Sequence, residues 1–97
     1  MNDLILRPRA EFDVQDTALW YEGQRVGLGL QFLGELDYVI NRIVNNPLQF
    51  PEIQSGVRRG LLRRFPYSVY FVLIEEHVEV IAVLHLHRDP DRFKGRS

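Results

Sequence analysis

Cysteine is absent from the 97-residue chain, and its absence excludes disulfide bonds, thiolate metal ligands and a cysteine nucleophile. No apolar run is long enough to span a bilayer, and Arg7 and Arg9 interrupt the N-terminus where a signal peptide has its apolar segment. Low-complexity stretches and internal repeats are also missing, while 45% of the residues are hydrophobic. We therefore expect one soluble globular domain that covers residues 1–97 and resides in the cytoplasm.

Positive charge is scarce in the first part of the chain. Residues 1–56 contain four arginines against eight acidic residues, a net charge of −4. Residues 57–97 contain eight basic against five acidic residues, a net charge of +3. The second part is therefore predicted to present a cationic surface to an anionic partner.

The first half of the sequence predicts a short strand and then a helix. The apolar run at residues 4–6 ends before Pro8, which cannot donate to a strand ladder. A helix over residues 9–25 is indicated by acidic residues at its start and a basic one at its end, as the helix dipole favours. We expect its acids, including Asp13, to be solvated. Its apolar face is predicted to comprise Val14, Ala18 and Tyr21, flanked by Phe12, Leu19 and Trp20.

A second helix is predicted from an apolar stripe with three- and four-residue spacing, ended by Asn45-Asn46-Pro47. The stripe consists of Leu33, Leu36, Ile40 and Ile43, widened by Phe32 and Val39. Glycine lowers helix stability by roughly 1 kcal/mol relative to alanine. The presence of Gly34 therefore indicates that the two helices pack closely there.

The second half of the sequence predicts three strands. Residues 47–56 carry two prolines and a glycine and indicate a loop. The β-rich runs 57–65, 67–74 and 78–86 are separated by short connections, which favours an antiparallel meander with the middle strand covered on both faces. The predicted fold class is α+β with the order β-α-α-β-β-β, in which an antiparallel sheet packs against an N-terminal helical hairpin. Residues 89–97 form a charged tail.

Three sequence strings carry a resemblance to a known family. They are Gly27-Leu28-Gly29-Leu30-Gln31-Phe32-Leu33, Arg58-Arg59-Gly60-Leu61-Leu62-Arg63-Arg64-Phe65-Pro66-Tyr67-Ser68-Val69-Tyr70-Phe71 and Val83-Leu84-His85-Leu86-His87-Arg88-Asp89-Pro90. Together with the element order they resemble the RelE/ParE toxins of type II toxin–antitoxin systems. The similarity is greatest to members called plasmid stabilisation proteins, and it covers nearly the whole chain.

The resemblance implies a growth-inhibiting toxin that a cognate antitoxin neutralises. ParE-like members of the family poison DNA gyrase, whereas RelE-like members cut messenger RNA on the ribosome. The resemblance implies no cofactor and no membrane partner. An antitoxin also suits the predicted fold, because apolar helices and an exposed strand edge offer a groove and a ladder to a peptide that folds on binding.

Four arginines near the start of the predicted sheet are the first candidate target-binding residues. On a continuous strand Arg59 and Arg63 share one face, and Arg58 and Arg64 share the other. Each pair then spans roughly 13 Å and can bracket an extended anion. The alternative is that these arginines lie on an edge strand, where their charge prevents pairing with another chain and no substrate is needed. Both interpretations stay open at this point.

Two departures from the RelE-like pattern favour the gyrase poison over the ribonuclease. RelE-like ribonucleases have a Tyr-Arg pair where this chain has Tyr67-Ser68, and a C-terminal tyrosine where it has Phe93. Serine supplies no cation and phenylalanine no phenolic proton. Arg88 does match the family's basic position after the last strand, so it joins the target-binding candidates.

His85 and His87 lie two residues apart on a predicted strand and point the same way. They can be a proton-transfer pair, and with Arg59, Arg63 and Arg88 they are the catalytic candidates of the ribonuclease hypothesis. A metal site is disfavoured because no third ligand stands nearby except Asp89 or His77, the latter in a predicted turn. The preferred interpretation is a polar end to a buried strand.

Several aromatic residues are weighed as base-stacking groups. Trp20, Tyr21 and Tyr38 occur at helical packing spacings, which favours a role in the core or in antitoxin contact. Tyr67 and Tyr70 are expected to pack on the sheet. The function hypotheses are, in order, a ParE-like gyrase poison, a RelE-like ribonuclease, and a non-toxic antitoxin-binding regulator.

Overall fold

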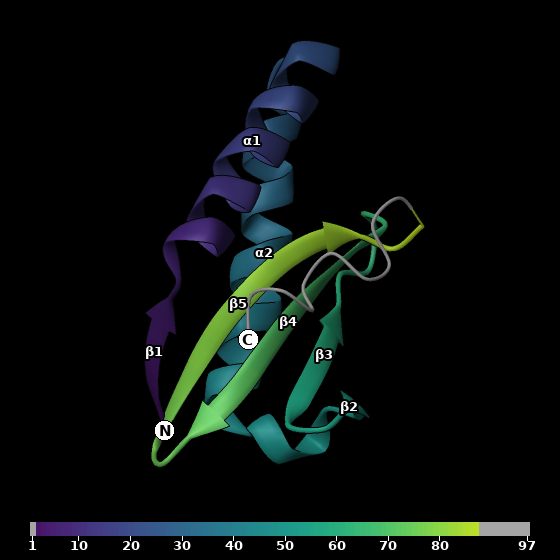
Figure 1. Cartoon of the computed structure of the whole chain (residues 1–97). Helices are drawn as coiled ribbons and strands as arrows, with labels where there is room; N and C mark the ends of the chain where they lie inside the picture. The colour runs from purple at the N-terminus through teal and green to yellow at the C-terminus, as the bar shows by residue number, and fades with distance from the viewer. Residues whose placement is uncertain (1, 88–97) are drawn as a thin grey trace.

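The computed structural model describes residues 2–87, and its elements follow the predicted order with two additions, η1 and β2. They are β1 (Asp3–Leu6), α1 (Pro8–Gln24), α2 (Leu28–Asn45), the 3-10 turn η1 (Pro47–Gln49), β2 (Glu52–Gln54), β3 (Val57–Leu61), β4 (Tyr67–Ile74) and β5 (His77–His85) (Figure 1). Arg88, Phe93 and the predicted tail lie outside the described residues. Neither α1 nor α2 is long and apolar enough to cross a membrane.

The five strands form one sheet in the order β1-β5-β4-β3-β2. The strands from β2 to β5 pair antiparallel, so the predicted meander is confirmed and β4 lies at its centre. β1 differs because it pairs parallel to β5, with Leu4 opposite Val78. The sheet is therefore mixed, since the helical hairpin carries the chain across one face of the sheet before the meander begins (Figure 1).

The segment 47–56 was predicted as a loop, and this is wrong in part. It contains η1 and the three-residue edge strand β2, which turns into β3 at Gly56. Gly56 has a φ of 77°, a conformation that favours glycine, and its N–H donates to the Glu52 carboxylate at 3.0 Å. A strand of three residues is too short to give an alternating pattern, so the sequence did not reveal it.

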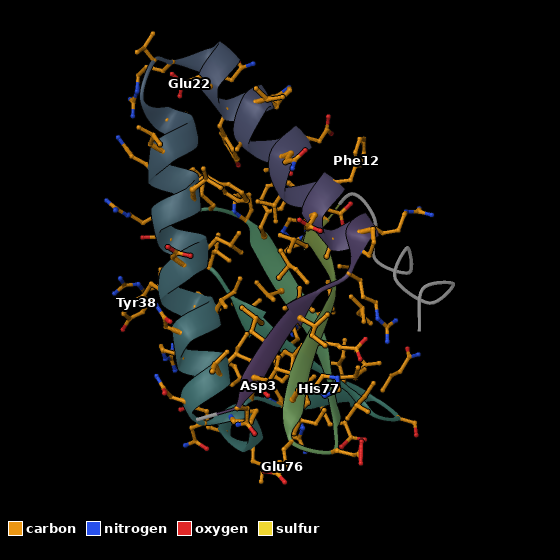
Figure 2. The ribbon with its side chains drawn as sticks, turned by 90° about the vertical axis from the view of Figure 1, so that its left-hand side faces the viewer. Asp3, Phe12, Glu22, Tyr38, Glu76 and His77 are labelled. Atoms are coloured by element: carbon orange, nitrogen blue, oxygen red, sulfur yellow. The ribbon has the colours of Figure 1, made fainter. Side chains whose placement is uncertain are left out.

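The main core lies between the helical hairpin and one face of the sheet. α2 contributes most of its apolar stripe, β4 and β5 supply opposing side chains, and the connections on either side of β3 add Phe50, Leu62 and Phe65. Leu33 departs from the prediction because it is 37% exposed. Phe12, Leu19 and Trp20 are also exposed, and Figure 2 shows Phe12 on the outer side of α1.

A second buried cluster lies on the other face of the sheet, to which neither α1 nor α2 contributes. We call this face the helix-free face, with reference to the described residues 2–87. The cluster consists of Val57, Tyr70, Ile81, Ala82 and Leu84. Residues 67–71 of β4 are all buried, so the prediction that the middle strand is covered on both faces is confirmed.

The close approach of the two helices occurs at Gly29, not at Gly34 as predicted. A Cβ atom added to Gly29 would lie 2.6 Å from the Ala18 carbonyl oxygen, whereas one added to Gly34 meets nothing within 4 Å. The Gly29 and Gly27 N–H groups donate to the Glu22 carboxylate at 3.0 and 2.9 Å. Glu22, at the tip of the hairpin (Figure 2), therefore fixes the turn between α1 and α2.

Asp13 was predicted to be solvated, and this is wrong. Its carboxylate is 6% exposed and accepts a hydrogen bond from the Val83 N–H at 3.1 Å. α1 thus buries Asp13 against β5, alongside Ala10 and Thr17. A buried carboxylate requires hydrogen-bond donors, because burial of a charge without them raises the free energy of the folded state.

Candidate functional site

The connection between β3 and β4 carries Arg63 and Arg64, and it is not the continuous strand that the sequence predicted. β3 ends at Leu61, and residues 63–66 form a bend. The buried Glu35 carboxylate of α2 accepts hydrogen bonds from the Arg63 and Arg64 N–H groups at 3.2 and 3.3 Å, and from Arg64 Nε at 3.2 Å. These hydrogen bonds hold residues 63 and 64 next to α2, so the chain does not continue as a strand beyond Leu61.

The Glu35 carboxylate is held ionised by these donors. Burial alone raises the pKa of the Glu35 carboxyl, but the hydrogen bonds from the Arg64 N–H, the Arg64 side chain and the Arg63 N–H outweigh burial and lower the pKa below its usual 4.5. A lowered folded-state pKa contributes stability above the unfolded-state pKa, and this contribution is lost as the pH falls through the folded-state value.

We expect Glu35→Gln to destabilise the chain near neutral pH and to reduce its sensitivity to acid. The amide keeps one acceptor oxygen but removes the charge, so the free energy of unfolding falls by about 1–2 kcal/mol at about pH 7 and by less at about pH 3. Urea unfolding at the two pH values measures the difference. Glu11→Gln is the control, because Glu11 is exposed on α1. An equal loss for Glu35→Gln at both pH values would contradict the assignment.

Arg63 and Tyr38 form a cation–π pair on the outer side of α2. The guanidinium carbon of Arg63 lies 4.7 Å from the centre of the Tyr38 ring, which is 48% exposed. Figure 2 shows Tyr38 pointing away from the sheet. Arg63 is therefore on the helix side of the molecule.

Arg58 and Arg59 lie side by side on β3 but point to opposite faces of the sheet. Arg58 Nη1 donates to the Phe50 carbonyl at 2.6 Å, and Arg58 Nη2 lies 3.6 Å from the Glu52 carboxylate. Arg59 is opposite Tyr70, a member of the cluster on the helix-free face. Within residues 2–87 the Arg59 guanidinium has no hydrogen bond or ion pair.

Neither interpretation of the four arginines survives as stated. Arg59 and Arg63 do not share a strand face, so the predicted bracket is wrong. β3 is not an edge strand either, since β2 covers its outer side. The Arg58 guanidinium contacts Glu52 and Phe50, that of Arg63 contacts Tyr38, and that of Arg64 contacts Glu35. Of these four arginines, Arg59 alone has a guanidinium without a contact of this kind within residues 2–87.

His85 and His87 lie close together, but the prediction that both stand on one strand is wrong for His87, which follows β5 in a turn. His85 is the last residue of β5, and its Nδ1 accepts the His87 N–H at 3.1 Å. The two rings are 5.9 Å apart, and the His85 ring also meets the Tyr67 ring edge-on at 5.2 Å. The pair therefore caps the end of the core beside Tyr67, on the face opposite Arg59.

His77 begins β5, so its predicted place in a turn is wrong. Its Nε2 lies 2.9 Å from the Glu79 carboxylate, which also accepts a bond from Arg7 Nε at 2.7 Å. The His77 hydrogen bond and then the Arg7 bond lower the pKa of the Glu79 carboxyl. The contact between Arg7 and Glu79 joins the β1–α1 junction to β5. No three His, Asp or Glu side chains converge as metal ligands anywhere in residues 2–87.

A pocket that the sequence did not reveal lies between α1 and the start of β4. Its volume is about 360 Å³, and its lining residues are Asp16, Thr17, Leu19, Trp20 and Tyr67. An adjoining apolar groove of about 240 Å³ runs between the helices along Ala18, Leu19, Glu22, Gly29, Leu30 and Leu33. The four-residue spacing of Asp16 and Trp20 was the available signal, but only the structure brings Tyr67 to them.

Known structures contain the same arrangement. A chain of the solved structure described as "Chromosomal ParDE TA system from P. aeruginosa" matches with a TM-score of 0.78 and 18% sequence identity, over 88% of this chain and 96% of that chain. The two chains share one fold. The α+β fold that the sequence resemblance implied is thus confirmed. No protein-family model matches the sequence, and no curated protein matches it.

Proposed function

We propose that this chain is the toxin of a type II toxin–antitoxin pair, neutralised by a cognate antitoxin, and that it inhibits growth in the cytoplasm by poisoning DNA gyrase. The observation that carries the proposal is the ParE-like fold, which matches a ParDE system over nearly the full length of both chains. The family strings in β3, β4 and β5 support it independently.

The placement of the candidate residues favours a binding poison over a ribonuclease. Metal-free RNA cleavage needs cations and proton-transfer groups around one phosphate. Here Arg59 points to the helix-free face, whereas His85 lies at the end of the opposite face beside Tyr67. Ser68, at the position of the RelE-like arginine, is fully buried. These residues do not converge on a common site.

Arg59 is the proposed lead contact with the target. Three neighbouring arginines already contact other groups of the chain, so their proposed role is to add positive charge around the Arg59 contact. They are Arg58, Arg63 and Arg64. Arg88 joins them as a proposed target-binding residue. A charged group that contacts a partner typically accounts for about tenfold or more in affinity.

The proposed antitoxin has two kinds of surface available to it. β1 is an edge strand with Leu4 and Ile5 nearly half exposed, and the groove between α1 and α2 is apolar. An unpaired strand edge accepts an added strand, and an apolar groove accepts a helix.

The test is controlled expression in bacteria combined with a supercoiling assay on purified gyrase. We expect growth arrest, a DNA-damage response, intact messages and inhibited supercoiling. Arg59→Ala should weaken gyrase inhibition about tenfold. Arg9→Ala is the control, since Arg9 is exposed on α1 and outside the proposed contact.

Other outcomes separate the alternatives. Ribosome-dependent cuts in translated messages, mapped by primer extension, would establish the ribonuclease instead. Absence of arrest by a folded chain that still binds the product of an adjoining antitoxin-like reading frame would identify a regulator without toxicity.

A further inference from the structure

The pocket between α1 and β4 combines one carboxylate with two aromatic rings. Asp16 and Trp20 are one helical turn apart, which places them on the same side of α1 about 5–6 Å from each other at their Cβ atoms. Tyr67 enters from the first position of β4 and is 5% exposed, so its ring forms the floor. Leu19 forms an apolar rim.

The Asp16 carboxylate differs from the other well-placed acids of the chain. Asp13, Glu35 and Glu79 all hold donors, whereas Asp16 makes no hydrogen bond or ion pair with any residue in the range 2–87. Asp16 therefore supplies, at the mouth of the pocket, a negative charge that no cation of residues 2–87 compensates. Such a charge attracts a cation, and the attraction is stronger where the pocket walls exclude water.

Trp20 is placed for contact with a ligand. It is the chain's only tryptophan, and it is 53% exposed although its ring packs edge-on against Tyr21 at 5.1 Å. The face of an indole ring is the most favourable aromatic surface for a guanidinium or ammonium group. A cation that reaches Trp20 also reaches Asp16, because both line the same 360 Å³ pocket.

We propose that this pocket binds the arginine or lysine side chain of a protein partner. Asp16 pairs with the charge, while Trp20 and Tyr67 enclose the stem and face the cation. Leu19 borders both this pocket and the apolar interhelical groove, so the partner segment should carry an apolar residue next to its basic one. Naming the antitoxin as this partner rests on the proposed function, whereas the cation specificity of the pocket does not.

The experiment titrates the full chain with N-acetyl-arginine amide and follows the fluorescence of Trp20, which is the only indole signal. N-acetyl-citrulline amide is the neutral ligand of the same shape. The variants are Asp16→Asn and, as a matched control, Asp37→Asn, because Asp37 is an exposed aspartate on α2 outside the pocket. Circular dichroism confirms that each variant is folded.

We expect saturable binding of the arginine amide that is about tenfold weaker for the citrulline amide and about tenfold weaker in Asp16→Asn, with Asp37→Asn unchanged. Equal responses to the charged and neutral amides, equal binding by Asp16→Asn, or no saturable response would each overturn the proposal. These results do not depend on toxicity. If the amide binds but Asp16→Asn leaves the affinity of an isolated antitoxin unchanged, only the identification of the partner fails.

Discussion

Phe32→Ala lowers the free energy of unfolding by about 3–5 kcal/mol, the range for truncation of a fully buried aromatic residue. Phe32 is 0% exposed, and its ring meets those of Tyr21, Phe65 and Tyr67 at centroid distances of 5.5 to 5.7 Å. These rings come from α1, α2, the β3–β4 connection and the first residue of β4. Removing the central ring therefore weakens the contact between hairpin and sheet and leaves a cavity.

Urea unfolding measures this effect, and Phe12→Ala is the matched control. Phe12 is 60% exposed on the outer side of α1, so its replacement should change the free energy of unfolding by less than about 0.5 kcal/mol. A domain of this size has a total stability of about 5–10 kcal/mol, so Phe32→Ala should leave a large unfolded fraction on mild heating and abolish growth inhibition. Similar unfolding midpoints for the two variants would contradict the packing described.

The second large effect concerns the helix junction. Gly29→Ala should lower the free energy of unfolding by about 1–3 kcal/mol, because the new Cβ lies 2.6 Å from a backbone oxygen that cannot rotate away. Either α1 or α2 must shift, and the shift strains the bond from the Gly29 N–H to Glu22. Thermal unfolding followed by circular dichroism measures the loss.

Gly34→Ala tests the same argument with the opposite sign. Gly34 lies in the interior of α2 with open space around it, so alanine should raise the free energy of unfolding by up to about 1 kcal/mol. Destabilisation by Gly34→Ala, or tolerance of Gly29→Ala, would show that the helices approach each other elsewhere.

The two glycines also show where the sequence was sufficient for the fold and where it was not. Periodicity located both helices to within a residue or two and identified most of the buried face of α2. Periodicity did not determine which glycine contacts the other helix, because the sequence does not show which residues lie near a glycine in the folded chain. The burial of Asp13 was missed for the same reason. A carboxylate on a helix is solvated unless another element places a hydrogen-bond donor next to it, and here the donor is the Val83 N–H of β5.

The candidate site was predicted less well than the fold, for a physical reason. The sequence identified Arg58, Arg59, Arg63 and Arg64 as a group, but the strand geometry applied to them fails where Glu35 binds the chain 28 residues downstream. Alternation along a strand is a local rule, and a buried carboxylate on another element overrides it. The pocket at Asp16 and Trp20 similarly required Tyr67, which lies 47 positions beyond Trp20 in the sequence.

The parallel pairing of β1 with β5 has a consequence for how the chain is made. Its first strand finds its partner only in the last strand, and the contacts of Arg7 and Asp13 likewise bridge 72 and 70 positions. During translation the two helices therefore emerge before the sheet that covers them, with their apolar faces open to solvent or to a chaperone. Cooperative folding of the nascent chain must wait for β5, and such long-range closure slows folding relative to a fold built from local contacts.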